Sequence, residues 1–201
     1  MSKVKIGIVG CGPIGTQVMY APIIKYFQHG EVTALMDIDK EALLFMTERY
    51  GTRDTFTDYD EFLRNADIDA VILVTPVWGH EEQVIKAAKA GKHILCEKPL
   101  ARTIEECDRM IQACEENQVI FMCAHVKRFD KSMLYVKKLI DDGVLGTIFQ
   151  IRVNWSYCNY STVGWRNKLN TLGGGYQDHG SHVIDLCRWW MGEIESVSGE
   201  V

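Results

Sequence analysis

Residues 4–15 read VKIGIVGCGPIG, and this stretch decides the fold of the chain. Its first half is an apolar run typical of a buried strand, and its second half spaces three glycines as G-x-G-x-x-G. Between a strand and a helix, such a loop lets the backbone approach a pyrophosphate closely at the positive end of the helix. A tight turn without a ligand also uses glycines. The strand before the loop and the helix expected after it favour a dinucleotide site.

An acidic residue ends the next expected strand, residues 32–36. Asp37 lies 22 residues after Gly15, close to the ~20 expected for the carboxylate that hydrogen-bonds an adenosine ribose. This carboxylate accepts from a ribose 2′-OH and would repel a 2′-phosphate, and the neighbouring Ile38 and Asp39 offer no cation to bind one. The sequence therefore favours NAD over NADP as cofactor.

Residues 1–125 alternate short apolar strands with amphipathic helices, and repeated β-α-β order predicts a parallel sheet with helices on both faces. Local signals mark the helix ends: Asp39 as an N-cap, Gly51 as a C-terminal stop, and Thr103 with Glu106 as a capping box. We expect residues 1–125 to form an α/β Rossmann dinucleotide-binding domain.

The pattern changes after Lys127. A helix is expected from Asp130 to Asp142, and apolar and polar residues then alternate from Phe149 to Trp155, as in an antiparallel strand with one buried face. A helix over 176–191 and a strand over 194–201 follow. We expect residues 126–201 to begin an α+β domain for substrate binding and oligomerisation, with an open, mostly antiparallel sheet. Two strands are too few for a stable sheet. The chain is therefore expected to be C-terminally truncated, to form a homo-oligomer or to be completed by a further polypeptide.

The composition is that of an ordinary globular protein, with 47% hydrophobic and 24% charged residues. A formal net charge of −5 disfavours a nucleic-acid partner, and no apolar run approaches the ~20 residues of a membrane span. No secretory signal precedes the first strand. Seven cysteines without a C-x-x-C pair suggest buried thiols in a reducing compartment, so a cytoplasmic location is expected.

Two further motifs follow expected strand ends, where ligands bind in open α/β sheets. They are Thr75-Pro76 and Glu97-Lys98-Pro99. Lys98 beside Glu97 could be a solvated surface pair, but its position at the carboxyl end of a strand favours a functional role.

A third motif lies on the helix expected at 176–191. Asp178, His182 and Asp185 fall on one stripe of this helix. An Asp one turn from a His can orient the imidazole and raise its basicity, as a general base requires. A purely structural histidine remains an alternative. A metal site that includes His179 is disfavoured, because His179 points away from the stripe and no H-E-x-x-H spacing is present.

Together these motifs resemble the Gfo/Idh/MocA family of NAD(P)-dependent oxidoreductases. The resemblance covers the whole chain and rests on G-x-G-x-x-G at 10–15, T-P-x-x-x-H at 75–80, A-G-K-H-x-L-C-E-K-P-L at 90–100, Arg128-Phe129, Trp165-Arg166, and G-G-G with D-x-G-x-H-x-x-D at 173–185. It implies hydride transfer between NAD and a secondary hydroxyl of a sugar, glycoside or cyclitol.

The resemblance also implies roles for particular residues. The cofactor would be held by Gly10, Gly12, Ile14, Gly15, Asp37, Thr75, Pro76, His80, Glu97 and Lys98. The catalytic group would be Lys98, Asp178 and His182, and the substrate side would include Arg128, Trp165 and Arg166. No metal is implied.

Two departures from the family pattern stand out. Val77 replaces an Asn that often follows Thr-Pro, and members of the family usually continue for well over a hundred residues past this point. Two alternatives remain: a dinucleotide- or sugar-sensing regulatory protein without turnover, and an NAD-dependent redox-cycling glycosidase. The presence of Lys98, Asp178 and His182 argues against a pure sensor.

Overall fold

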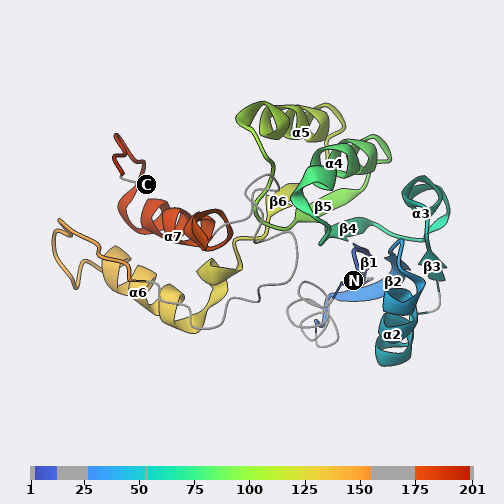
Figure 1. Ribbon diagram of the computed structural model, residues 1–201. Coiled ribbons are helices and arrows are strands. Elements are labelled where there is room, and N and C mark those ends of the chain that lie inside the picture. Colours follow the sequence, from blue (N-terminus) through green and yellow to red (C-terminus); the bar gives the residue numbers. More distant parts are fainter. Residues whose placement is uncertain (1–2, 13–26, 53, 155–174, 200–201) are drawn as a thin grey trace. The chain divides into compact units, whose positions relative to one another are not determined.

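The computed structural model describes residues 3–12, 27–52, 54–154 and 175–199 (Figure 1). The chain divides into two compact units, residues 1–124 and residues 125–201.

The first unit is built on a six-stranded sheet in which all neighbouring strands are parallel. The strands are β1 (Val4–Val9), β2 (Gly30–Met36), β3 (Asp54–Phe56), β4 (Ala70–Leu73), β5 (His93–Cys96) and β6 (Phe121–Cys123). Their order is β3-β2-β1-β4-β5-β6. This is the doubly wound order, in which the direction of winding reverses between β1 and β4. The predicted Rossmann-like α/β fold is confirmed.

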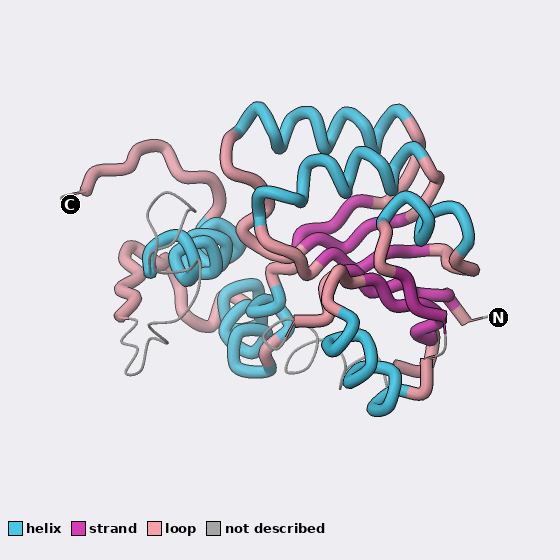
Figure 2. The backbone as a smooth tube through the Cα atoms, turned by 45° about the vertical axis from the view of Figure 1, so that its right-hand side comes forward, coloured by secondary structure: helices cyan, strands magenta, loops and turns pink. Residues whose placement is uncertain are grey.

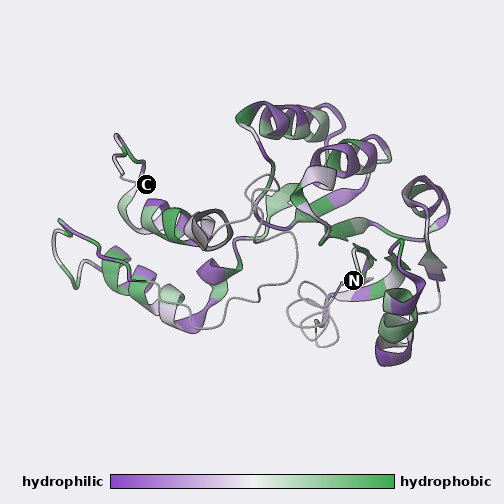
Figure 3. Ribbon diagram, viewed as in Figure 1, coloured by the Kyte–Doolittle hydropathy of each residue, from purple (hydrophilic) through white to green (hydrophobic). Residues whose placement is uncertain are grey.

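Helices cover the sheet of the first unit (Figure 2). They are α2 (Lys40–Tyr50), α3 (Tyr59–Asn65), α4 (His80–Lys89) and α5 (Ile104–Glu116), with a short 3₁₀ turn η2 (Val77–Gly79) before α4. Figure 1 shows α4 and α5 side by side. Val71, Leu73 and Met110 have no exposed surface, and the strands are largely hydrophobic while α4 and α5 carry hydrophilic residues on much of their surface (Figure 3). Burial of this apolar surface is the main force that holds the unit together.

Helix ends in the first unit follow the local signals. The Asp39 carboxylate accepts hydrogen bonds from two backbone N–H groups of the first turn of α2, and Gly51 ends that helix with φ 73°. The Thr103 hydroxyl accepts from the Glu106 N–H at 3.2 Å. The predicted capping box differs in its second half, because the Glu106 carboxylate accepts from the backbone N–H of Arg102 at 2.8 Å and also binds the Arg102 guanidinium. This ion pair lowers the pKa of the Glu106 carboxyl group.

All the regular secondary structure in the described part of the second unit is helical. It contains the 3₁₀ turn η3 (Val126–Phe129), α6 (Lys131–Asp141) and α7 (Gly175–Met191). The predicted mostly antiparallel sheet is wrong: residues 147–154 and 192–199 form no strand, and the sheet found in the described part of the chain is all parallel. An alternation of apolar and polar residues stabilises a strand only when neighbouring strands pair with it and one face of the strand is buried. Phe149 is 92% exposed, so the described residues supply neither condition.

Candidate active site

Four adjacent strands of the first unit bring the predicted cofactor residues to one edge of the sheet. Gly10 follows β1, Asp37 follows β2, Thr75 lies just after β4, and Glu97 follows β5. Because these strands are parallel, their carboxyl ends meet at the same edge (Figure 1). The winding reverses between β1 and β4, which is where open α/β sheets bind ligands.

Gly10 occupies a position that only glycine fits. Its φ is 93°, and a Cβ there would lie 2.7 Å from the carbonyl oxygen of Val74. The Gly10 N–H donates to the carbonyl of Met36 at 2.9 Å, so the loop is tied to the ends of two neighbouring strands. At Gly12 a Cβ would meet no described atom within 4 Å. Among the described residues, the backbone at Gly12 is thus open on the side where its side chain would point. Ile14 and Gly15 lie outside the described residues.

The Asp37 carboxylate lies against the glycine loop. It accepts from the backbone N–H of Cys11 at 2.5 Å and from that of Asp39 at 2.9 Å. A carboxylate has about four acceptor positions, so these two bonds leave capacity for ribose hydroxyls. Cys11 is fully buried, and burial together with Asp37 raises the pKa of its thiol to about 12. Cys11 is therefore an inert packing residue.

His80 joins the loops that follow β4 and β5. Its imidazole Nε2 lies 2.8 Å from the carbonyl oxygen of Thr75, and Nδ1 lies 3.1 Å from the carbonyl oxygens of Pro99 and Leu100. Burial lowers the pKa of His80, and the three carbonyls oppose that effect. The side chain was predicted to line the dinucleotide. Both ring nitrogens face backbone carbonyls of these two loops, and the place of His80 beside the dinucleotide stays a prediction.

Replacing His80 with phenylalanine is expected to lower the free energy of unfolding by about 1–3 kcal/mol, the cost of leaving buried carbonyls without a donor. The phenyl ring keeps an aromatic side chain but is larger than imidazole, so the loss includes the cost of fitting it at this buried position as well as the lost hydrogen bonds. Urea unfolding of the cofactor-free protein measures it. The exposed His29 supplies the control, since His29→Phe should stay within about 0.5 kcal/mol of wild type. Equal stabilities of wild type and His80→Phe would show that the hydrogen bonds of His80 contribute nothing to the free energy of unfolding.

Glu97 and Lys98 follow β5 directly. The Glu97 N–H donates to the carbonyl of Leu73 at 2.9 Å, which extends the β4–β5 ladder by one residue. Glu97 is 8% exposed as a residue, and its carboxylate accepts from the backbone N–H of Lys98 at 2.6 Å. The Lys98–Pro99 peptide bond is cis. Lys98 is a partly buried residue, and the family resemblance implies that its ammonium group takes part in the chemistry.

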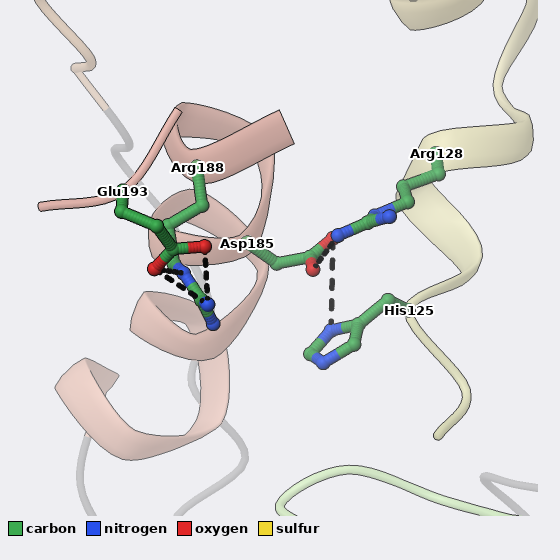
Figure 4. A network of polar contacts seen from close by, with 5 residues as sticks. All are labelled: His125, Arg128, Asp185, Arg188 and Glu193. Carbon is green, nitrogen blue, oxygen red and sulfur yellow. Dashed lines mark hydrogen bonds and ion pairs between the residues drawn. The ribbon is translucent and has the colours of Figure 1, made fainter. Parts of the chain in front are cut away.

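The second unit carries a polar network between η3 and α7 (Figure 4). The Asp185 carboxylate, 8% exposed, accepts from Arg128 Nε at 2.8 Å and from Arg128 Nη2 at 2.6 Å. His125 Nδ1 lies 3.9 Å from Asp185 Oδ2. His182, one turn before Asp185 on α7, is 6% exposed, and its ring meets that of His125 edge to face, with centroids 6.4 Å apart.

Arg128 was predicted on the substrate side, which stays a prediction, and within the second unit its guanidinium binds Asp185. Two of its N–H groups hold Asp185, which raises the pKa of Arg128. Its guanidinium carbon also lies 5.6 Å from the centroid of the Trp189 ring. Arg128 is thus built into the support of α7.

The side chains of three other predicted site residues lie outside the described residues. Asp178 belongs to α7, one turn before His182, but its side chain lies outside the described residues, as do Trp165 and Arg166. Sequence reasoning left His125 and Asp185 out of the site. For Asp185 a signal was present in the sequence, because it lies one helical turn after His182. For His125 no local signal existed, because it meets α7 across some 60 residues of chain.

The described residues contain no group of three or more His, Cys, Asp or Glu side chains that could hold a metal ion. Across these same residues, no helix is both long and apolar enough to cross a membrane.

Sequence comparisons agree in the family that they identify. Residues 4–125 match the GFO/IDH/MocA oxidoreductase family with an NAD-binding Rossmann fold, and residues 133–201 match a GFO/IDH/MocA C-terminal domain. The chain is 33% identical to a 2,7-anhydro-N-acetylneuraminate hydratase of Mediterraneibacter gnavus, with 100% of this chain and 54% of the relative aligned. It is 30% identical to a myo-inositol 2-dehydrogenase of Thermotoga maritima, over 96% of this chain and 57% of the relative.

A solved structure gives a similar result. The scyllo-inositol dehydrogenase of Lactobacillus casei, crystallised with NAD(H) and scyllo-inositol, superposes with a TM-score of 0.80 at 32% identity, over 95% of this chain and 57% of that one. The chain spans about half the length of the curated relatives it matches.

Proposed function

Since the chain belongs to the Gfo/Idh/MocA oxidoreductase family, we propose that it binds NAD and catalyses hydride exchange with a secondary hydroxyl of a sugar, glycoside or cyclitol. The observation that carries this proposal is the glycine loop at the β1–β4 reversal, with the Asp37 carboxylate beside it. The inositol dehydrogenase with NAD(H) and scyllo-inositol supports the same cofactor and substrate class.

The residues at this edge fit a dinucleotide. The backbone at Gly12 is open to a pyrophosphate, Asp37 keeps acceptor capacity for a ribose, and Thr75, Pro76 and Glu97 lie at neighbouring strand ends. Gly10, Ile14, Gly15, His80 and Lys98 complete the proposed set. When bound, NAD supplies the acceptor or donor of the hydride.

Three residues carry out or support the proton transfer in this proposal. His182 accepts the proton of the substrate hydroxyl, and Lys98 hydrogen-bonds the same oxygen and stabilises its developing negative charge. Asp178 orients the imidazole or the substrate. The substrate side of the site includes Arg128, Trp165 and Arg166 in this proposal, and Arg128 also binds Asp185 of α7.

A substrate panel tests the proposed function. Purified protein is incubated with NAD and with inositols, free sugars and glycosides, while NADH formation and product release are both followed. NADH formed with any of these alcohols supports a dehydrogenase. Binding of NAD without any turnover contradicts it and favours a sensor.

A second candidate, net redox-neutral turnover, is favoured by one observation. A relative at 33% identity is named a hydratase rather than a dehydrogenase. Product formation from a glycoside or anhydro-sugar with no net NADH would identify this reaction class.

Asp37 is expected to set the cofactor preference. Asp37→Ala should weaken NAD binding and reduce discrimination against NADP, because it removes both the acceptor for the 2′-OH and the charge that repels a 2′-phosphate. Paired titrations of wild type and variant with NAD and NADP measure the ratio of the two affinities. Asp39→Ala is a useful control for loss of charge near the loop. An unchanged NAD/NADP ratio in Asp37→Ala contradicts the ribose assignment.

A further inference from the structure

Gln83, in the first turn of α4, reaches back to the carboxyl end of β4. Its side-chain oxygen Oε1 accepts a hydrogen bond from the Thr75 hydroxyl at 2.5 Å. A Cβ at Gly79 would lie 3.6 Å from the Gln83 carboxamide, which is ordinary van der Waals distance. The Gln83 side chain therefore packs against the end of η2 and bonds a residue of the loop that follows β4.

The backbone of Gln83 is anchored separately, by a residue of α3. The Tyr59 hydroxyl donates to the Gln83 carbonyl at 2.8 Å, and burial raises the pKa of Tyr59, so this hydroxyl keeps its proton. The Tyr59 ring is stacked on that of Phe62, which has no exposed surface. A side chain that starts from a fixed backbone loses less freedom when it forms a hydrogen bond. The bond from Thr75 to Gln83 is therefore preorganised.

Thr75 is a partly buried residue that is held beside the glycine loop. Its carbonyl oxygen lies 2.8 Å from His80 Nε2, and its hydroxyl is bonded to Gln83. Its backbone nitrogen lies 3.1 Å from the position that a Cβ at Gly10 would occupy. Both polar groups of Thr75 that face α4 are thus fixed next to the loop proposed for the pyrophosphate.

The direction of the bond decides what Thr75 can offer to a ligand. A hydroxyl has one hydrogen and two acceptor lone pairs. Because the hydrogen of Thr75 is directed at Gln83, a group that approaches Oγ1 meets lone pairs. A ribose hydroxyl can donate to them, whereas an ionised phosphate has no hydrogen to donate. This orientation of Thr75 therefore suits a ribose of a dinucleotide and not its pyrophosphate.

From this network we propose that Gln83 is a positioning residue for the cofactor: it fixes the Thr75 hydroxyl as an acceptor for one ribose hydroxyl of NAD. The proposal rests on the function proposed above, which places NAD at this edge of the sheet. Without the Gln83 carboxamide, the Thr75 hydroxyl would rotate, and NAD binding would have to order it.

A double-mutant cycle on NAD affinity tests the proposal on the full chain. Thr75→Val removes the hydroxyl and keeps the branched shape, and Gln83→Met removes the acceptor and keeps the length of the side chain. Each single variant should bind NAD about 3- to 10-fold more weakly, the usual value of one hydrogen bond. In the double variant, Gln83→Met should add no further loss, because it acts only through the Thr75 hydroxyl.

The same cycle excludes a merely structural role. An equal loss from Gln83→Met with and without Thr75→Val would overturn the proposal, as would wild-type NAD affinity in Gln83→Met. Thr75→Ser keeps the hydroxyl and should bind NAD nearly as well as the wild type. The matched control is Gln112→Met, which changes an exposed glutamine of α5 that bonds Glu116 and should leave NAD affinity unchanged.

Deoxy analogues of NAD, each with one ribose hydroxyl replaced by hydrogen, test the acceptor role. One analogue should bind the wild type about 3- to 10-fold more weakly than NAD does. Thr75→Val should bind that analogue as well as it binds NAD. If every analogue loses the same factor in the wild type and in Thr75→Val, Thr75 accepts from no ribose hydroxyl and the proposal is overturned.

These measurements are of binding and need no turnover, so their outcome is separable from that of the proposed function. The expected coupling in NAD binding, together with no hydride transfer to any substrate, would contradict the proposed function and support the role of Gln83. Turnover with NAD but no coupling between Thr75 and Gln83 would support the proposed function and overturn the role of Gln83.

Discussion

Replacing His182 with alanine is expected to lower the proposed turnover of a sugar or cyclitol alcohol by about 100-fold or more, the usual loss when a general acid–base group is removed. The Lys98→Ala variant gives a loss of the same order. In both cases NAD affinity stays largely intact, because neither change touches the glycine loop or Asp37. Initial rates of NADH formation, with NAD binding measured by titration, provide the two quantities.

The physical reason is the charge that develops on the substrate oxygen. As the hydride leaves carbon, the hydroxyl must lose its proton, and an unprotonated imidazole accepts it. An ammonium group hydrogen-bonded to the same oxygen stabilises the alkoxide until transfer is complete. Each residue acts mainly on the transition state, so kcat should fall more than KM rises.

Matched controls separate chemistry from folding. Lys89 is an exposed lysine at the end of α4, and Lys89→Ala should keep the wild-type rate. His182 is 6% exposed, so His182→Gln is a second variant that fills more of the same space than alanine. Rates near wild type for His182→Ala and Lys98→Ala, in folded protein, would remove the proposed mechanism.

The Gly10→Ala substitution is expected to weaken NAD binding by more than ten-fold and to destabilise the first unit. The added methyl carbon would lie 2.7 Å from the Val74 carbonyl oxygen, and φ at this residue is 93°, where side chains are strained. Strain of this kind costs on the order of 1–3 kcal/mol. The loop must therefore shift away from the end of β4, which is where the cofactor is proposed to lie. Urea unfolding and NAD titration measure the two effects.

Gly12 offers a matched comparison. A Cβ at this position meets no described atom within 4 Å, so Gly12→Ala should change the free energy of unfolding by no more than about 0.5 kcal/mol. It should still weaken NAD binding, because the methyl group occupies space proposed for the pyrophosphate. If Gly10→Ala and wild type bind NAD equally, the glycine loop is not the cofactor site.

Several features of the fold could be predicted because their causes are local. The Asp39 cap, the Gly51 stop and the Thr103 cap each depend on residues within a few positions along the chain. The parallel sheet followed from apolar runs that alternate with helices. The short strand β3 was not predicted, since three residues at a sheet edge leave little periodicity to detect. The antiparallel strands were predicted wrongly, because alternation says nothing about whether a partner strand is present.

The sequence by itself determined the family, the Rossmann-like fold and the carboxyl-edge positions of Gly10, Asp37, Thr75 and Lys98, because glycine spacing and strand order are written along the chain. The tertiary structure decided what individual side chains do there. His80 reaches carbonyls 19 and 20 residues away, and Arg128 reaches Asp185 across 57 residues. Such contacts form only when separate elements pack, and a hydrogen bond depends on where the packed backbone brings its donor and acceptor.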